Sequence, residues 1–529
     1  MQIPSEKTPD ARLVIAHFRL GAAGALLFAL ALVAYHRLLP GPYYTHRLFA
    51  VTHVAVLAWV TMIIFGALYQ LLPVIVRAPL HSERLAWRTL GLFATGAIGL
   101  SAGFAVGATQ TAIPAFAAVT YLAILLFAYN VIASFRQAKA WPVNAHFIAA
   151  AVLWLVLTAT LGFTLALDQR WHFTGARTLA LVHAHLNWGL IGWFLQLILG
   201  AGATLMPMFL VSHDIHVRRL LPAFYALNGG LLVLSVYFLA GTPRPWLWAA
   251  YTLIVLAIAI YISFLYRSFR RSIRAIDAPM QISIAAFAGL PVVTAIAAII
   301  LWPFRLSPTL YVLAALFLFV FPLLIGQSFK TLPFIVWLDR YRRRVGKQRV
   351  PMPTDLYSAR TVAVQNGLYA ISTLLILIGF GWRQMVLLAA GSLAFLATIV
   401  AYAVQLFRIA GHRAVRTEEI DSGAARDIKQ LLRTIPDPEL NVNIVDLGLI
   451  YRLGFRPEQK RIRVDMTLST PACPVGDTIV LQVVEKLQKA YPGFDVDVRL
   501  VFDPPWTPDR ITDEGRRLLG TRHPILKGK

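Results

Sequence analysis

From residue 59 the chain reads Trp59-Val-Thr-Met-Ile-Ile-Phe-Gly66-Ala-Leu-Tyr-Gln-Leu-Leu-Pro73, an aromatic residue followed by glycine and then proline at seven-residue steps. The same spacing recurs over residues 193–207 and 319–333, so the three glycines are 134 and 126 residues apart. Each copy lies inside an apolar stretch long enough to cross a bilayer, and about four such stretches fit in one period. The pattern predicts a threefold repeat of four-helix units.

The composition indicates a membrane protein. Hydrophobic residues make up 58% of the chain, charged residues only 14%, and the mean hydropathy is +0.65, which is incompatible with a water-soluble core under a polar shell. We therefore expect an all-α polytopic bundle of twelve spans, with the lipid bilayer as its partner. The expected spans are 13–35, 48–71, 85–108, 112–133, 146–167, 178–204, 220–240, 246–266, 281–302, 309–329, 361–380 and 384–407.

The distribution of basic residues predicts the orientation. Most Lys and Arg lie in the N-terminal segment, the even-numbered connections and the start of the tail. The opposite connections contain only Arg37, Arg47, Arg170, Arg177, Arg244, Arg305 and Arg383. The positive-inside rule then places both termini in the cytoplasm, and we expect a prokaryotic inner membrane. The net charge of +24 reflects this topology, with the basic cluster at 340–349 able to contact lipid headgroups; nucleic acid is not an expected partner.

After the membrane domain (1–410) the sequence becomes mixed and charged. We expect a linker at 411–423, a cytosolic α+β domain at 424–520 and a short tail at 521–529. Helical periodicity covers 424–434, strand alternation appears near 443–452, 460–468 and 495–502, and a second helix runs from Pro474 to about Ala490. The single cysteine, Cys473, excludes a disulfide framework.

Four motifs of this domain occur in a distinctive order. They are Asp437-Pro-Glu, Asn443-Ile-Val-Asp-Leu-Gly-Leu-Ile-Tyr451, Thr467-Leu-Ser-Thr-Pro-Ala-Cys-Pro474 and Asp503-Pro-Pro-Trp-Thr-Pro-Asp-Arg510. Together they resemble the family of iron-sulfur cluster assembly factors that includes SufT-like and PaaD-like proteins. The resemblance covers about a fifth of the chain and implies a role in maturing iron-sulfur proteins, with Cys473 as the reactive residue.

The position of Cys473 suits a reactive thiol. The residue follows an expected strand and precedes a helix starting near Val475, where backbone N–H groups and the helix dipole favour a thiolate that can bind iron. One cysteine cannot supply the four ligands of an iron-sulfur cluster, so a transient cluster would need a client or carrier protein, a small thiol, or a homodimer through this domain. The alternative is a buried, inert cysteine.

Three carboxylates and one indole in these motifs each have two possible roles. Asp437, Glu439 and Asp446 are either metal ligands or residues that cap and brace their loops. Trp506 sits in a proline-rich loop, where its indole either covers the cysteine or contacts a partner.

The twelve-span domain resembles the catalytic subunit of heme-copper oxidases and nitric oxide reductases. The segments that carry the resemblance are Thr52-His-Val-Ala-Val-Leu-Ala-Trp59 continuing to Pro73, and His183-Ala-His-Leu-Asn continuing to Met206-Pro-Met. The family implies that His53 is an axial ligand of a heme b and that His183 or His185 binds copper. The expected tenth span contains no histidine, the seventh lacks a histidine pair, and Asn187 stands where a tyrosine would follow His183. Oxygen reduction by the oxidase mechanism is therefore not expected.

An altered heme or copper site is one interpretation of His53, His183 and His185, since neutral imidazole suits either metal. Counting back from the repeat prolines places His53 and His183 on nearly equivalent helix faces, with His185 on another. Acceptors for the second ring nitrogen would come from Asn187, Gln70, Gln196 or Thr52. The alternative is that these histidines only form hydrogen bonds between helices.

Two functions follow. The first is a membrane-anchored iron-sulfur cluster assembly or maturation factor fused to a degenerate oxidase-like domain. The second is a heme- or copper-binding redox protein that acts on, or senses, nitric oxide, oxygen or quinol. A secondary transporter is disfavoured because Asp and Glu fall almost entirely outside the spans.

Overall fold

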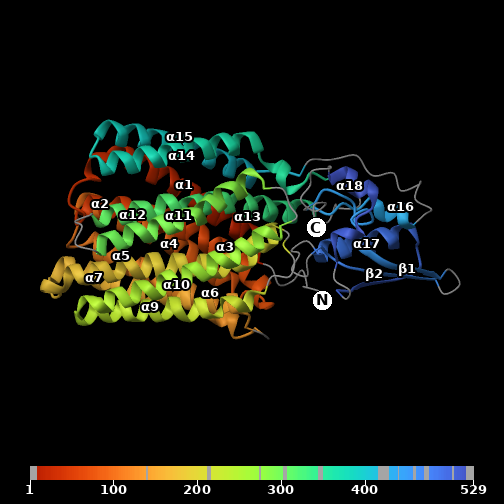
Figure 1. Ribbon diagram of the computed structural model, residues 1–529, viewed down its shortest axis with the longest axis horizontal. Helices are drawn as coiled ribbons and strands as arrows, with labels where there is room; N and C mark the ends of the chain where they lie inside the picture. The colour runs from red at the N-terminus through yellow and green to blue at the C-terminus, as the bar shows by residue number, and fades with distance from the viewer. Residues whose placement is uncertain are drawn as a thin grey trace.

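The fold is a long bundle of twelve apolar helices with a small α+β domain beyond one end (Figure 1). This computed structural model describes residues 9–138, 141–210, 212, 216–272, 276–301, 307–342, 350–414, 428–438, 440–456, 460–469, 476–502 and 506–519. Each of the twelve expected spans coincides with a helix long and apolar enough to cross a membrane, which indicates a membrane protein.

Nine of the twelve candidate spans are built around one long helix each. These are α1 (Ala11–Tyr35), α4 (Glu83–Val106), α5 (Ala112–Phe135), α6 (Val143–Trp171), α9 (Leu221–Ala240), α10 (Arg244–Arg270), α11 (Ala278–Leu301), α14 (Ala359–Gly381) and α15 (Met385–Ala410). Spans two, six and ten are composite. Span two consists of α2 (His46–His53), η3 (Val54–Thr61) and α3 (Met62–Val76). Span six consists of α7 (Thr178–Asn187), η5 (Trp188–Leu195) and α8 (Gln196–Leu210). Span ten consists of α12 (Pro308–Ala314), η7 (Ala315–Val320) and α13 (Phe321–Tyr341).

The threefold sequence repeat has a structural counterpart in these composite spans. The middle segments η3, η5 and η7 are π-helical, and each contains the repeat aromatic residue, Trp59, Trp193 or Phe319. π-helical turns are rare inside α-helices and often lie at functional sites. Their recurrence at one position supports three related four-helix units.

The repeat glycines lie where helices cross closely. A Cβ atom added to Gly66 would come within 2.4 Å of His17 Cβ on α1, and one on Gly200 within 2.7 Å of Phe147 Cβ on α6. At Gly326 the added atom would meet Ser283 of α11. Each glycine thus lets its span pack against the span that precedes it in the same unit.

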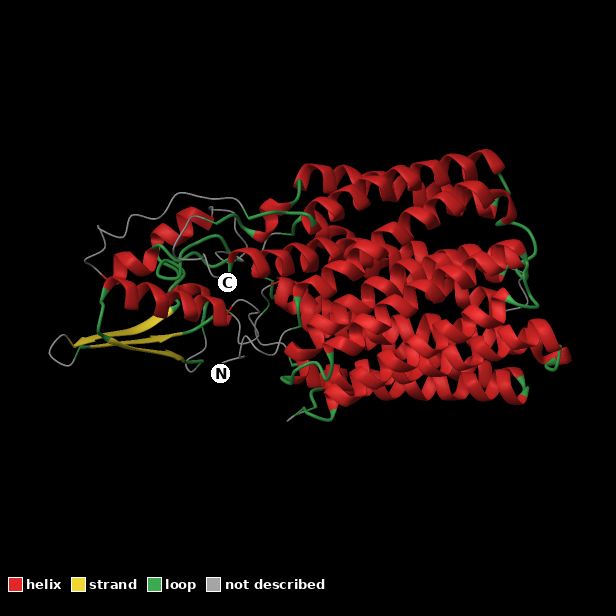
Figure 2. Cartoon of the chain, turned by 180° about the vertical axis from the view of Figure 1, so that it is seen from behind, coloured by secondary structure: helices red, strands yellow, loops and turns green. Residues whose placement is uncertain are grey.

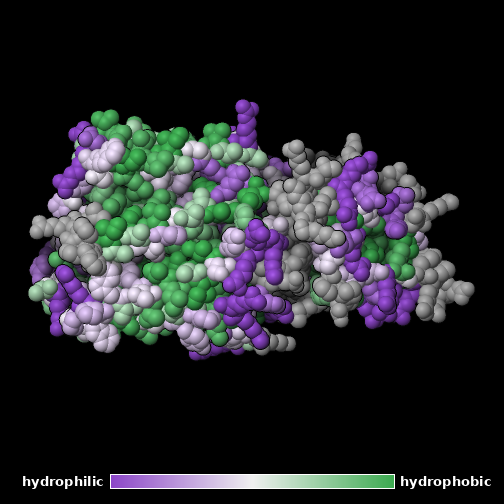
Figure 3. Space-filling view, viewed as in Figure 1, coloured by the Kyte–Doolittle hydropathy of each residue, from purple (hydrophilic) through white to green (hydrophobic). Residues whose placement is uncertain are grey.

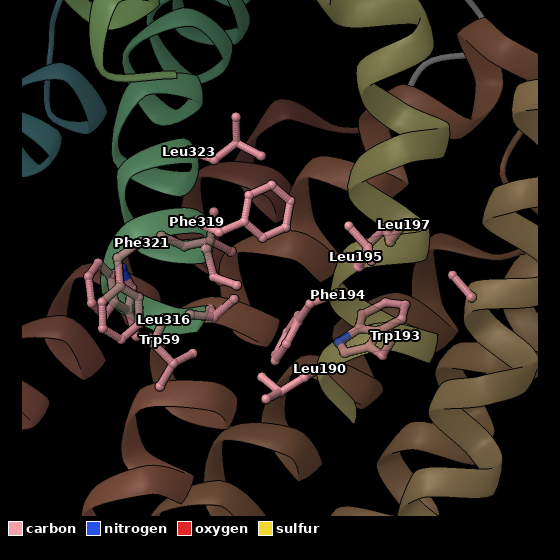
Figure 4. Packing of buried hydrophobic residues seen from close by; sticks show 14 of the residues in the cluster. Trp59, Leu190, Trp193, Phe194, Leu195, Leu197, Leu316, Phe319, Phe321 and Leu323 are labelled. Carbon is pink, nitrogen blue, oxygen red and sulfur yellow. The ribbon is translucent and has the colours of Figure 1, made fainter. Parts of the chain in front are cut away.

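The three repeat helices meet around the middle of the bundle. Trp59 stacks on Phe321 with ring centres 4.5 Å apart, and Trp193 donates to Thr61 Oγ1 at 3.3 Å. Figure 4 shows Trp59 beside Phe321 and Trp193 next to Phe194 on the neighbouring helix. A cavity of about 120 Å³ between the three helices is lined by equivalent positions of the repeats, including Ile63, Leu197 and Leu323; Ile64, Ile198 and Leu324; and Ala67, Ala201 and Gln327.

The surface agrees with burial in lipid. A broad apolar band covers the bundle in Figure 3, with hydrophilic residues gathered toward its two ends. The tenth span continues past its expected end at 329 to Tyr341, because Trp337 and Tyr341 pack with Leu356 and Ala414 in a small separate core. Beyond them lies the α+β domain. Phe334 of the tenth span packs against the core of this domain.

The α+β domain contains a three-stranded sheet in the order β1-β2-β3 among the described residues. Its elements are α16 (Ile428–Arg433), β1 (Ile450–Arg456), β2 (Arg461–Met466), α17 (Gly476–Ala490), β3 (Asp495–Leu500) and α18 (Asp513–Leu519). β1 runs antiparallel and β3 parallel to β2, because α17 carries the chain back between β2 and β3. The helices gather on one side of the sheet (Figure 2).

One expected strand was wrong in its bounds. Of the stretch 443–452, Asn443 forms an isolated β-bridge with Pro436, residues 444–448 form turns, and β1 begins only at Ile450. The amide of Leu447 donates to Asn443 O, and Gly448 adopts a φ of +69°. A Cβ on Gly448 would lie 2.2 Å from Arg510 O, so apolar alternation here reflects a buried turn and not a strand.

Candidate functional sites

The segment between β2 and α17 forms the first candidate site. β2 ends at Met466, the amide of Thr467 bonds Leu449 O at 2.8 Å, and α17 starts at Gly476. Cys473 itself lies outside the described residues. Because it is three positions from Gly476, chain geometry keeps it within about 11 Å of the start of α17.

Buried polar side chains flank this segment. Thr467, Ser469 and Gln482 are at most 2% exposed, and their side-chain polar atoms have no hydrogen-bond partner among the described residues. Buried polar groups are normally paired. Thr467 and Ser469 directly precede the cysteine segment in the chain, and Gln482 lies on the helix that follows it.

Asp446 braces the domain. Its carboxylate accepts hydrogen bonds from Asn443 Nδ2 at 2.6 Å and Thr512 Oγ1 at 2.9 Å, and lies 3.4 Å from Arg433 Nη2. The backbone carbonyl of Asp446 also accepts from the Thr512 amide. These bonds occupy the carboxylate, so the structure favours the bracing interpretation of Asp446 over a ligand role.

The remaining loop residues have separate environments. Asp437 is 1% exposed and its Oδ1 accepts from the Leu440 amide at 3.2 Å, an arrangement typical of a loop-shaping aspartate. Glu439 lies outside the described residues. Trp506 is 5% exposed and donates from Nε1 to Leu447 O at 2.7 Å, so this indole belongs to the domain core and does not present a surface for a partner.

The second candidate site is a cavity at the end of the bundle far from the α+β domain, where α2, α7 and α12 lie (Figure 1). Its volume is about 270 Å³ and its walls are mostly apolar. His53, His183 and His185 all line it. The structure therefore gathers the three histidines singled out in the sequence.

Two of these histidines lie next to each other, and the third contacts other aromatic rings. The rings of His53 and His185 are 6.4 Å apart, centre to centre, with a 21° angle between their planes. His183 instead stacks on Tyr43 at 5.9 Å and contacts Phe238 at 6.0 Å. The separate helix face expected for His185 does not keep it out of the cavity, because His185 lines the cavity together with His53 and His183.

The hydrogen bonds of the pair also differ from expectation. His53 Nδ1 bonds Phe49 O at 2.8 Å, and His185 Nδ1 bonds Thr158 O at 2.9 Å. The acceptors are thus backbone carbonyls. The side chains expected in that role bond elsewhere: Thr52 to Leu48 O, Asn187 to His183 O, and Gln196 to Asn228.

One buried ion pair was missed in the sequence. Lys330 on α13 pairs with Asp277 just before α11, and its side chain is 6% exposed. The repeat could have pointed to this residue, since Lys330 stands four positions after the repeat glycine Gly326. The second repeat has Thr204 at the same position, and Thr204 Oγ1 accepts a hydrogen bond from Asn144 Nδ2 at 2.6 Å. Polar residues at this position join each of these two repeat helices to the preceding span.

The C-terminal domain defines a class of protein. Residues 425–500 match the iron-sulfur cluster assembly protein family. Through this domain the chain belongs to that family.

Individual relatives agree. An Fe-S protein maturation auxiliary factor of Porphyromonas gingivalis is 38% identical over 94 residues, which is 18% of this chain and 89% of the relative. The auxiliary factor SufT of Staphylococcus aureus is 39% identical over 84 residues (16% and 94%), and YitW of Bacillus subtilis 33% over 101 residues (19% and 98%). A crystal structure of a domain of unknown function from Bacillus anthracis shares 32% identity over 18% of this chain and 90% of that one, with a TM-score of 0.17.

Proposed function

We propose that the protein is a membrane-anchored factor for the assembly or maturation of iron-sulfur proteins, with Cys473 as the residue that contacts the metal-sulfur cargo. The observation that carries this proposal is the similarity of the C-terminal domain to maturation auxiliary factors over nearly their whole length. The bundle would hold this domain at the membrane surface, close to membrane-bound clients.

The chemistry of Cys473 limits what the domain can do alone. A thiolate ahead of α17 would be stabilised by the helix dipole and would bind iron as one ligand. The other ligands would come from a client or carrier protein or from a second copy of the domain. Asp437 and Glu439 remain candidates for weak additional ligands of the iron, whereas the Asp446 carboxylate is already bonded to Asn443, Thr512 and Arg433. A short-lived complex suits a factor that passes clusters on.

A test uses the fact that Cys473 is the only cysteine in the chain. The full chain and its Cys473→Ala variant are expressed in a bacterium lacking its own maturation factor of this family, and the activities of iron-sulfur enzymes and their iron content are measured. We expect rescue by the full chain and loss of rescue by Cys473→Ala, because the substitution removes the thiolate ligand.

Expression level and membrane insertion of the two proteins serve as controls. An alanine variant that rescues as well as the full chain would exclude Cys473 as the functional residue. A segment covering 424–529 that rescues without the bundle would exclude an obligatory role for membrane anchoring.

The second candidate function is a heme- or copper-binding redox protein acting on or sensing nitric oxide, oxygen or quinol, with the bundle as a degenerate relative of the oxidase subunit. The observation that favours it is the His53–His185 pair in an apolar cavity. The residues present fit a heme better than copper. No group of three or more His, Cys, Asp or Glu side chains able to hold a metal ion exists among the described residues, and a heme supplies four of its own ligands.

A further inference from the structure

The end of the eighth span borders a groove that combines basic and apolar side chains. The groove lies between α10 and the short helix η6 (Val217–Leu220), at the end of the bundle from which the α+β domain extends (Figure 1). Its volume is about 280 Å³. We propose that this groove binds an anionic phospholipid through its phosphate headgroup. The site is separate from both the cysteine segment and the histidine cavity.

The positions of the lining residues along α10 give the groove two kinds of wall. Ala259, Ile260, Phe264, Arg267 and Arg271 all line it, and their spacing places them on one face of the helix. From Ala259 to Arg271, a rise of about 18 Å at 1.5 Å per residue, this face changes from apolar to basic. A phospholipid has the same order of chemistry, with acyl chains followed by a phosphate group.

The basic end of the groove carries an excess of positive charge. Guanidinium groups remain protonated, so Arg219, Arg267 and Arg271 supply three positive charges, and His216 lies beside them. No Asp or Glu lines the groove in the described part of the chain. The carbonyl end of α10 contributes only about half a negative charge. The charge of this end therefore suits an anion.

A second basic pocket at the same end of the bundle differs in this respect. Its Arg340 lies 3.2 Å from the Asp339 carboxylate, from Nε to Oδ2, and its Arg19 donates to Ala410 O at 2.9 Å. In the groove, Arg267 Nη2 donates to Ser263 Oγ at 3.0 Å. A hydroxyl group orients the guanidinium along the wall without neutralising its charge, so the groove is the better anion site.

The surroundings favour a lipid over free phosphate. Tyr266, next to Arg267 on α10, is 63% exposed, and exposed tyrosines are typical of the membrane–water interface. Hydrophilic residues gather at this end of the bundle, beside the apolar band (Figure 3). Free phosphate would use only the basic end of the groove, whereas a phospholipid would also cover Ala259 and Ile260. Basic pockets beside membrane spans attract anionic headgroups in this way.

The test measures lipid binding to the full chain purified in detergent, by native mass spectrometry, with the thermal unfolding midpoint as a second measurement. The probes are dioleoylphosphatidylglycerol, which is anionic, dioleoylphosphatidylcholine, which is zwitterionic, and inorganic phosphate. We expect the wild type to bind the anionic lipid about tenfold more tightly than the zwitterionic one. The double variant Arg219→Gln/Arg267→Gln should lose most of this preference, because two of the three fixed charges are removed.

The matched control is Arg218→Gln/Arg270→Gln. Both residues are exposed and belong to η6 and α10, but neither lines the groove, so the same charge is removed from the same helices. This control should bind the anionic lipid as the wild type does. Equal losses in the two double variants would overturn the proposal, because binding would then reflect overall charge. Equal binding of the two lipids by the wild type would overturn it as well.

Two further arms separate charge from folding and lipid from free anion. Arg219→Lys/Arg267→Lys keeps the charge and should keep the lipid preference, which a misfolded protein would not show; loss of the preference in this folded variant would contradict a site defined by charge. Inorganic phosphate that raises the unfolding midpoint as much as the anionic lipid does would overturn the assignment to a lipid. Cys473→Ala should bind lipid normally, so failure of this proposal is distinct from failure of the iron-sulfur proposal.

Discussion

The charge of Asp446 illustrates how single polar side chains organise the C-terminal domain. Burial alone would raise the pKa of this carboxyl, but the hydrogen bonds from Asn443 and Thr512 and the Arg433 guanidinium outweigh it and hold the pKa below its usual range. A lowered carboxyl pKa stabilises the folded state above the pKa of the unfolded chain and loses this effect as the pH falls. The brace is therefore an acid-sensitive element.

We predict that Asp446→Asn lowers the free energy of unfolding of this domain by about 2 kcal/mol at pH 7, since hydrogen bonds to a buried charge are lost. Hydrogen exchange of β2 and α17 amides in the full chain measures the effect. The difference from wild type should begin to shrink below about pH 4, where an aspartate of the unfolded chain becomes protonated, and should be lost as the pH falls through the lowered pKa of Asp446 in the folded state.

Asp495→Asn is the matched control, because the Asp495 side chain is 69% exposed; its effect should be small. Equal effects of the two substitutions would contradict the bracing role of Asp446.

Among the helices, spans two, six and ten are special because each combines a π-helical segment with a glycine crossing. The π segment changes the angular phase of the helix, so the residues before it face directions that a regular α-helix would not predict. The glycine then sets how closely the preceding span approaches. Together these two features position the histidines at the far end of the bundle.

We predict that Gly66→Ala destabilises the bundle, because the new methyl group would meet His17 Cβ at 2.4 Å and overpacking costs about 1–3 kcal/mol. The thermal unfolding midpoint in detergent measures the loss. Gly91→Ala on α4 is the control, since no atom lies within 4 Å of its added Cβ. A Gly66→Ala protein as stable as Gly91→Ala would show that the crossing tolerates a wider separation.

Considered as a whole, the molecule carries its two candidate sites at opposite ends. The histidine cavity lies at the end formed by α2, α7 and α12, and the α+β domain lies beyond the other end (Figure 1). A heme at the histidines would therefore not touch the cysteine segment. Any coupling between them would pass along the length of the bundle.

The proposed orientation, with both termini cytoplasmic, places Cys473 inside the cell. Because the chain has a single cysteine, a membrane-impermeant thiol reagent labels only this residue. We predict labelling in inside-out membrane vesicles and none in sealed right-side-out vesicles. Labelling of the detergent-solubilised protein gives the full extent of the reaction. Labelling in right-side-out vesicles would contradict the proposed orientation and would place the C-terminal domain outside the cell.

The sequence by itself determined the twelve helices, the threefold repeat and the family of the C-terminal domain. These features depend on local properties: apolar runs of bilayer length, a recurring Gly and Pro spacing, and motifs in a fixed order. It also identified His53, His183 and His185 as residues of interest, since imidazoles are rare inside apolar spans.

Only the tertiary structure decided which residues meet. The pairing of His53 with His185, the bracing role of Asp446 and the burial of Trp506 all depend on contacts between segments 59 to 132 residues apart. Helix periodicity orients a side chain relative to its own axis, whereas the rotation between packed helices determines what that side chain faces. The turns at 444–448 were misread for the same reason, because their apolar residues serve burial under Arg510 and Trp506 and not strand pairing.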